Sequence, residues 1–227
     1  KFSPNPFAVF YRDHDLYCMG ASPERYLSLK ENELCSQPIK GTAKRALHNA
    51  EQDLASKLAL QNSTKELSEN VMVVDLVRND LSKICESGSV TVKELYGIYS
   101  FPQVHQMIST VCGRAPKDLH WVDAIAATFP MGSMTGAPKK RVLQLIEQYE
   151  CSKRGLYSGA IGYVTPRLNE QRNFDFNVVI RSMLYNANTC YLSFQTGSAI
   201  TFYSDPEQEY EECLLKAEAM KKVLETT

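Results

Sequence analysis

The 227-residue sequence has few of the features that would place it in a specialised class. It has 25 basic and 26 acidic residues, and a net charge of −1 excludes the broad positive field of a nucleic-acid-binding protein. It shows no apolar run of membrane-spanning length and no signal peptide. These absences predict a cytoplasmic protein without a nucleic-acid or membrane partner.

Cysteine and histidine are also arranged without a ligand pattern. The seven cysteines are scattered, odd in number and free of any C-x-x-C pair, which argues against a zinc site and against a disulfide framework. They favour a reducing compartment instead. The four histidines are widely spaced, and we expect His105, on a predicted strand, to be structural.

The hydrophobic pattern predicts a mixed fold in one domain over residues 1–227. Short apolar segments joined by short turns predict strands within 7–37 and at 89–100, 104–113, 156–165, 174–186, 189–196 and 198–203. Helical spacing predicts helices within 50–84, at 121–129, after the loop 130–139, and at 206–226. Within the first range the expected core stripe is Leu67, Val71, Val74 and Val77 or Arg78. The expected fold class is α/β (α+β) with mostly antiparallel sheets. The first residue is Lys1, in what reads as mid-protein sequence, so an N-terminal portion is expected to be missing.

The segment Gln37–Thr42 places one lysine between a proline and a glycine. Pro38 fixes its own φ and Gly41 permits an unusual backbone path, so the segment predicts a turn that holds the amine of Lys40 rigidly. A lysine held in this way and partly desolvated can act as a neutral nucleophile. The alternative is an ordinary solvated surface lysine.

Two pairs of glutamates lie three residues apart on predicted helices. Glu66 and Glu69 form the first pair, and Glu209 and Glu212 form the second, so each pair shares one helix face. Four carboxylates from two helices can hold a hard divalent cation. The alternative is a solvated helix face, and Lys216, four residues after Glu212, predicts a simple ion pair there.

Further candidates lie at predicted turns and strand ends. Glu24 can be a general acid if burial raises its pKa, or a partner for a neighbouring base such as Arg25. Arg181 follows an apolar strand and needs an anionic partner, either a substrate carboxylate or an aspartate. The loop 130–139 and the turn 197–199 can present backbone N–H groups to an anion, or can be a capped tight turn and a plain hairpin.

Eight segments in this order resemble the chorismate-utilising enzymes, which include the large subunit of anthranilate synthase, component I of aminodeoxychorismate synthase, and isochorismate and salicylate synthases. The matching segments run from residue 21 to about residue 217 and read ASPERYL, PIKGT, ENVMVVDLVRND, FPMGSMTGAPKKR, YSGAIGY, VVIRS, TGSAI and DPEQEYEECLLKA. The resemblance implies a sandwich of large antiparallel sheets flanked by helices. It also implies that this chain is the catalytic C-terminal half of a protein about twice as long.

The resemblance also implies a cofactor, a substrate and residue roles. A Mg²⁺ ion would be bound by Glu69 and Glu212, with Glu66 and Glu209 holding its water molecules. Chorismate would be bound through its two carboxylates and its ring by Gly41, Thr42, Ser133, Tyr157, Arg181, Gly197, Ala199 and Lys216. Within this set Tyr157 and Arg181 would grip the enolpyruvyl carboxylate, and Glu24 would protonate the departing C4 hydroxyl.

Lys40 indicates a subfamily within this resemblance. Aminodeoxychorismate synthases usually read PIKGT and anthranilate synthases PIAGT. The lysine is thought to attack C2 of chorismate, after which ammonia from a glutaminase partner adds at C4 to give 4-amino-4-deoxychorismate, a precursor of p-aminobenzoate and folate. Gln106 replaces a histidine that anthranilate synthases associate with pyruvate loss, which fits this assignment. Ala199 departs from the usual GAGI turn and puts substrate affinity there in question.

Two alternatives stay open at this point. The first is an anthranilate synthase or another chorismate-converting enzyme, against which Lys40 and Gln106 count. The second is a non-catalytic subunit that only docks a glutaminase, against which the retention of all four glutamates counts.

Overall fold

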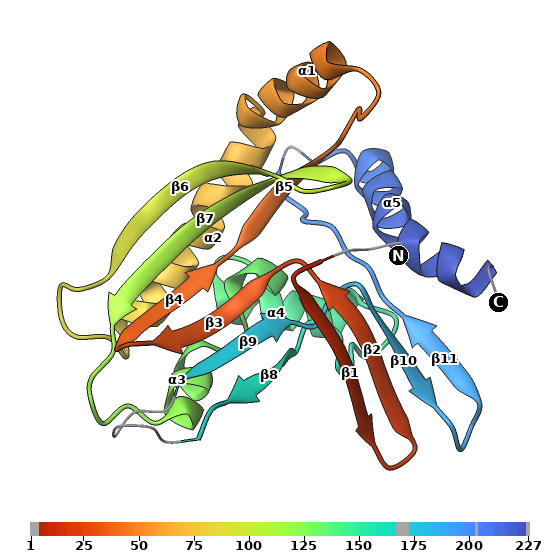
Figure 1. The fold of residues 1–227 in the computed structure, drawn as a ribbon. Coiled ribbons are helices and arrows are strands. Elements are labelled where there is room, and N and C mark those ends of the chain that lie inside the picture. The colour runs from red at the N-terminus through yellow and green to blue at the C-terminus, as the bar shows by residue number, and fades with distance from the viewer. Residues whose placement is uncertain (1–4, 167–172, 203, 226–227) are drawn as a thin grey trace. The chain divides into compact units, whose positions relative to one another are not determined.

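The computed structural model describes residues 5–166, 173–202 and 204–225 (Figure 1). The chain divides into two compact units. The first unit comprises residues 1–23, 152–161 and 177–227, and the second comprises residues 24–151 and 162–176. No helix among the described residues is both long enough and apolar enough to cross a membrane.

The first unit is built on a four-stranded antiparallel sheet. The strand order is β1-β2-β10-β11, formed by β1 (Phe7–Asp13), β2 (Leu16–Ser22), β10 (Ser182–Asn186) and β11 (Tyr191–Phe194). The chain then leads into the helix α5 (Pro206–Glu225). The backbone N–H of Gln208 donates to the Asp205 carboxylate at 3.0 Å, which caps the start of this helix.

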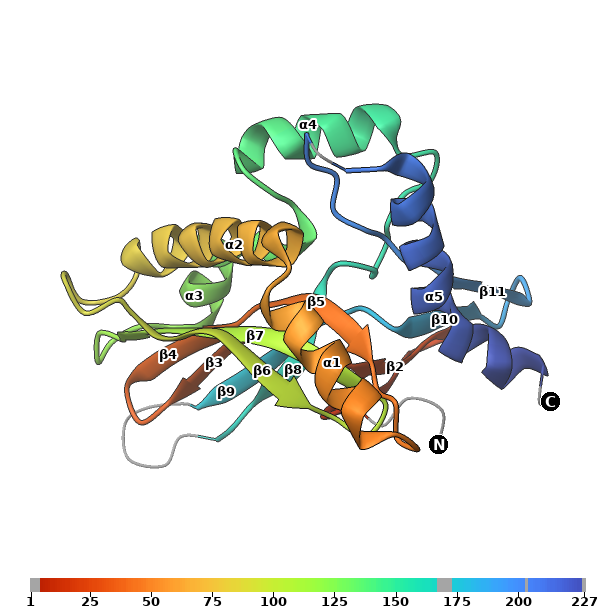
Figure 2. The same ribbon diagram turned by 90° about the horizontal axis from the view of Figure 1, so that it is seen from above.

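The second unit contains most of a larger sheet, in the order β5-β7-β4-β3-β9-β8 with β6 paired to β7, and the chain passes from one unit to the other within β8 and β9. Its strands are β3 (Arg25–Lys30), β4 (Glu33–Gln37), β5 (Ile39–Lys44), β6 (Thr91–Ser100), β7 (Val104–Arg114), β8 (Ala160–Val164) and β9 (Phe174–Val178). Its helices are α1 (Ala50–Gln61), α2 (Thr64–Ser82), α3 (Trp121–Thr128), the 3₁₀ turn η1 (Gly132–Met134) and α4 (Lys139–Tyr149). Figure 2 shows α2 lying across one face of this sheet.

The core of the second unit lies between α2 and β7. Val73, Val77 and Leu81 recur at the spacing of one helix face and are buried, as are Met107 and Val111 of β7. Val74 and Val77 of the predicted stripe are buried, whereas Val71 is 42% exposed and lies outside it. The predicted antiparallel α/β fold class is confirmed.

His105 is structural, as expected. It lies on β7, is 1% exposed and bonds to the Ser100 hydroxyl at 2.9 Å and to Asp53 at 3.3 Å. Asp53 in turn accepts a hydrogen bond from the guanidinium of Arg45 and forms an ion pair with it. This hydrogen bond is the main reason that the pKa of Asp53 falls to about 2. The network ties α1 to the end of β5 and to β7.

Two expectations about strands were wrong. The segment around Lys40 is not a turn but part of β5, whose pairing with β7 shifts register between Ile39 and Thr42. Gly41 has a φ of +91° and lies where this register shifts. The glycine therefore marks an irregularity within the strand, whereas the sequence suggested a turn at this point. In the described part of 198–203 there is no strand, since this stretch leads directly into the cap of α5.

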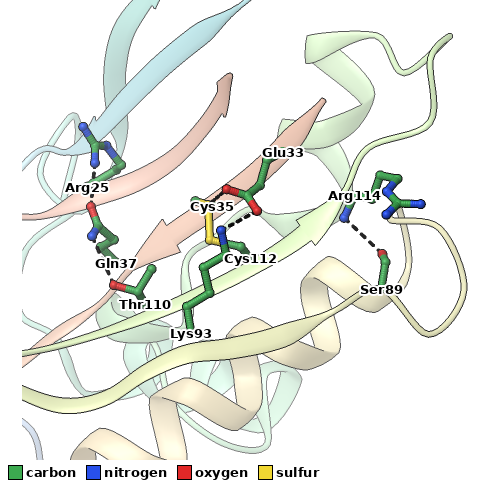
Figure 3. Close-up of a disulfide and its surroundings, with 9 residues drawn as sticks. All are labelled: Arg25, Glu33, Cys35, Gln37, Ser89, Lys93, Thr110, Cys112 and Arg114. Carbon is green, nitrogen blue, oxygen red and sulfur yellow. Dashed lines mark hydrogen bonds and ion pairs between the residues drawn. A yellow bond between two sulfur atoms is a disulfide. The ribbon is translucent and has the colours of Figure 1, made fainter. Parts of the chain in front are cut away.

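The absence of a disulfide was also predicted wrongly. Cys35 and Cys112 are joined by a disulfide between β4 and β7 (Figure 3). They are directly opposite in the antiparallel register, although 77 residues separate them in sequence. Sequence spacing could not show this, because the pairing of β4 with β7 brings the two residues together.

We expect reduction of this disulfide to lower the free energy of unfolding by about 4 kcal/mol, because it restores the entropy of a long loop in the unfolded chain. Denaturant unfolding with and without a dithiol reductant measures the difference. A Cys35→Ser/Cys112→Ser variant should be insensitive to reductant, whereas Cys151→Ser, at an exposed free cysteine, should behave as the wild type. Seven titratable thiols in the unreduced protein would contradict the disulfide.

Candidate active site

In the second unit, β5 lies against the first turn of α2. A Cβ built on Gly41 would lie 3.0 Å from a carboxylate oxygen of Glu66 and 2.9 Å from a methyl carbon of Leu60. The backbone of Gly41 is therefore in direct contact with the glutamate, and a side chain at this position would displace it. The N-cap of α2, Ser63, accepts from the backbone N–H of Glu66 at 3.4 Å, which fixes the start of the helix beside the strand.

Lys40 precedes this glycine on β5. Its side chain is neither buried nor fully exposed. Within the described residues, its amine has no hydrogen bond, ion pair or aromatic contact. Lysine is rarely buried without a partner, so an amine that no described residue engages is available for a ligand.

Two of the predicted acidic site residues are buried in the second unit. Glu24, at the turn before β3, is 5% exposed and Glu69, on α2, is 6% exposed. The Lys65 amine lies 4.0 Å from a Glu69 carboxylate oxygen. A solvated helix face is therefore the wrong interpretation for Glu69, because a buried carboxylate needs a cation or hydrogen-bond donors.

The first unit holds the second glutamate pair near the turn 197–199. Glu209 is 4% exposed and accepts a hydrogen bond from the Ser198 hydroxyl. The Lys216 amine lies 2.6 Å from a Glu212 carboxylate oxygen and donates to the carbonyl of Gly197 at 2.9 Å. The ion pair expected from the i,i+4 spacing is confirmed, and it also fixes the small-residue turn to α5.

Arg181 and Tyr157 lie in the first unit as well. Arg181 has a φ of +51°, a conformation uncommon outside glycine, and its guanidinium donates to the carbonyl of Lys216 at 3.4 Å. Burial lowers the pKa of Arg181, while the charges of Tyr157 and Glu212 oppose this shift. The Tyr157 hydroxyl lies 3.0 Å from the position that a Cβ on Gly197 would take, so this glycine leaves room for the phenol.

The first unit also contains a pocket of about 180 Å³ beside Tyr157. Polar side chains that the sequence did not single out line it, among them Ser182, Ser193 and Gln195. The Gln195 amide donates to the hydroxyl of Ser152 at 3.1 Å. The alternation of β10 and β11 could have indicated these positions only once the faces of the sheet were known.

The predicted site residues therefore form two groups, one in each unit. The second unit holds Glu24, Lys40, Gly41, Thr42, Glu66, Glu69 and Ser133, and the first holds Tyr157, Arg181, Gly197, Ala199, Glu209, Glu212 and Lys216. Each unit holds two of the four glutamates, and carboxylate oxygens are ligands that a hard cation such as Mg²⁺ accepts. Among the described residues, the one cluster of three close metal-ligating groups is Glu33, Cys35 and Cys112, whose sulfurs form the disulfide.

Comparison with known proteins resolves the family. Residues 1–222 match the family of chorismate binding enzymes. The chain belongs to this family. The match covers both units and every predicted site residue.

Individual relatives agree with this assignment. The chain is 44% identical, over 99% of its length, to a probable chloroplastic aminodeoxychorismate synthase of Oryza sativa subsp. japonica, and covers 25% of that protein. It is 38% identical, over 97% of its length, to aminodeoxychorismate synthase component 1 of Klebsiella aerogenes and covers 48% of it. The crystal structure of anthranilate synthase component I from Streptococcus pneumoniae TIGR4 matches 96% of the chain and 46% of that protein, with 35% identity and a TM-score of 0.80.

The chain thus spans about a quarter of the plant relative and about half of the bacterial ones. The large antiparallel sheets and the mixed α/β class are shared with the solved structure.

Proposed function

We propose that this chain carries the chorismate-converting activity of an aminodeoxychorismate synthase, in which chorismate and ammonia give 4-amino-4-deoxychorismate. The observation that carries the proposal is Lys40, which precedes Gly41 on β5 and whose amine has no partner among the described residues. The names of the plant and Klebsiella relatives support the same reaction. The "component 1" of the Klebsiella name also supports a partner subunit, which we propose is a glutaminase that supplies the ammonia.

The proposed mechanism uses the two groups of residues for different tasks. Lys40 attacks C2 of chorismate while the C4 hydroxyl departs with a proton from Glu24, whose burial suits a general acid. Ammonia then adds at C4, the double bonds shift back, and the lysine amine is expelled. Tyr157 and Arg181 bind the enolpyruvyl carboxylate.

The remaining residues hold the ring. Glu69 and Glu212 would bind Mg²⁺ directly and Glu66 and Glu209 through water, and the ion supplies positive charge that neutralises the ring carboxylate. The backbone at Gly197 and Ala199 would face the ring carboxylate, and the hydrogen bond from Lys216 to the Gly197 carbonyl fixes this turn to α5. Gly41, Thr42 and Ser133 line the substrate pocket.

The experiment that tests this proposal is product analysis. The protein is incubated with chorismate, Mg²⁺ and an ammonium salt, and the products are identified by mass. Formation of 4-amino-4-deoxychorismate supports the proposal. If anthranilate is the product, the chain is an anthranilate synthase component. If chorismate is not converted, the remaining alternative is a non-catalytic subunit that docks a glutaminase.

The structure disfavours the anthranilate alternative at one position. Gln106 on β7 is 5% exposed and pairs in register with Thr42 of β5. The neighbouring His105 bonds to Ser100 and Asp53, so its ring is already engaged and cannot replace a histidine at 106.

Arg181→Lys should weaken chorismate binding roughly 30- to 100-fold, because an ammonium cannot form the paired hydrogen bonds that a guanidinium gives a carboxylate. Thermal stability should hardly change, since the hydrogen bond of the guanidinium to the described residues is a long one, at 3.4 Å from a carbonyl. Equilibrium binding and a melting curve separate the two effects. A large loss of stability with unchanged binding would make Arg181 a purely structural residue.

A further inference from the structure

The two ends of the loop 129–138, between α3 and α4, are joined by an amine that pairs with a buried carboxylate of α2. Asp80 on α2 is 5% exposed. One of its oxygens accepts from the amine of Lys139, the first residue of α4, at 2.5 Å. The same amine donates to the carbonyl of Thr128, the last residue of α3, at 3.3 Å. A single amine therefore joins both ends of the loop 129–138 to α2.

The loop itself also rests on α2. A Cβ built on Gly132 would lie 2.9 Å from the Cβ of Leu76, so the loop backbone is in contact with the helix. The Thr128 hydroxyl is within 2.6 Å of the Tyr26 hydroxyl. A cavity of about 20 Å³ between Tyr26, Asp80, Thr128 and Gly132 has room for no more than one water molecule. These contacts hold the loop backbone against α2.

Asp80 has a second amine partner that makes a natural comparison. Lys83 bonds to its other carboxylate oxygen at 2.9 Å. Lys83 stays on α2, and half of its side chain is exposed, whereas the Lys139 side chain is 21% exposed and comes from α4. The two lysines neutralise the same carboxylate, but only Lys139 connects it to the loop.

We propose that Asp80 and Lys139 form a positioning pair, the Asp80–Lys139 clamp, which sets the place of Ser133 in the loop 129–138. The part that concerns Ser133 rests on the proposed function, in which this residue lines the chorismate site. Ser133 lies on η1 at the middle of the loop, and its hydroxyl makes no hydrogen bond to any described residue. Its place is therefore determined by the backbone, and the backbone is held by the clamp.

The test compares Lys139→Met with Lys83→Met. Lys139→Met should lower kcat/KM for chorismate roughly 10- to 100-fold, because small displacements of a contact group are costly. Lys83→Met should stay within about twofold, as for most exposed ion pairs. Lys139→Arg, which keeps the charge and a donor, should recover most of the loss.

Two further measurements separate positioning from general stability. Hydrogen exchange should rise in peptides covering 129–138 in Lys139→Met and stay unchanged in peptides from β7. In a double-mutant cycle, Ser133→Ala should add little to the kinetic loss of Lys139→Met, because both changes remove the same contact. Should Lys139→Met not fold, Asp80→Asn/Lys139→Met removes both charges and leaves no unpaired buried ion.

Equal effects of the two lysine variants, or exchange that rises throughout the second unit, would overturn the clamp. Fully additive losses with Ser133→Ala would overturn its link to Ser133. If the wild-type protein neither binds nor converts chorismate, the proposed function fails, and the exchange comparison still decides whether Lys139 holds the loop.

Discussion

Lys40→Ala should lose roughly 10³-fold in the rate of 4-amino-4-deoxychorismate formation, the loss typical of removing a covalent nucleophile. The substitution is mild for the fold. Lys40 lies on β5, its side chain is partly exposed, and its amine has no partner among the described residues whose loss would destabilise the sheet. The Gly41–Glu66 contact and the glutamates remain in place. The variant should therefore bind chorismate nearly as well as the wild type.

The same variant can reveal a second reaction. With the amine gone, ammonia at high concentration can add slowly at C2, as in relatives that carry alanine in this position. The product mixture, measured by mass at high ammonium, should therefore shift from the C4 to the C2 amine. A chorismate-derived adduct on Lys40 of the wild-type protein would support the covalent step directly.

Lys44→Ala is the matched control for this experiment. Lys44 is the last residue of β5 and is exposed, so its removal should change neither rate nor product. If Lys40→Ala behaves like Lys44→Ala, with wild-type rate and product, Lys40 is an ordinary surface lysine and the assigned branch of the family is wrong.

The sequence predicted most elements of the fold because their patterns are local. Alternation along β2, β3 and β4 and the helical stripe of α2 follow from which side chains avoid water, and the cap at Asp205 follows from backbone N–H groups that need acceptors. The buried face of a helix was harder to predict than the helix itself. Val71 fell outside the buried face of α2, which is set by Val73, Val77 and their contact with β7.

The features that the sequence could not give depend on pairing between distant segments. The disulfide needs the register of β4 against β7, which places Cys35 opposite Cys112. The strand at Lys40 needs β7 as a partner, since Pro38 and Gly41 alone indicate a turn. The Asp80–Lys139 clamp joins residues 59 positions apart, each of which is an ordinary charged residue in the sequence. Helix spacing already suggested one cation site for the two glutamate pairs, and the family resemblance assigned the role of each glutamate in it.

Burial is what distinguishes the glutamates from a solvated surface. Glu69 and Glu209 are 6% and 4% exposed, while Glu211, on the same helix as Glu209, is exposed. A carboxylate is kept ionised away from water only by positive charge or by donors. Ser198 supplies a donor to Glu209, and Lys65 lies 4.0 Å from Glu69.

Glu69→Gln should therefore weaken Mg²⁺ binding by roughly 10²-fold or more and reduce turnover by at least as much at limiting Mg²⁺. The amide is isosteric but removes one negative charge, and a site with few carboxylate ligands tolerates little loss of charge. Folding should survive, because a neutral side chain is easier to bury than the carboxylate that it replaces. Calorimetric titration with Mg²⁺ gives the affinity without relying on activity.

Glu211→Gln provides the control, since it removes the same charge from an exposed position two residues from Glu209. It should leave Mg²⁺ affinity unchanged, which shows whether the effect of Glu69→Gln comes from coordination or from net charge. Raising Mg²⁺ should restore part of the turnover of Glu69→Gln if binding alone is impaired. Undiminished activity of the wild type in EDTA, or equal Mg²⁺ affinity in both variants, would exclude Glu69 as a metal ligand and leave the Lys65 contact as the reason for its burial.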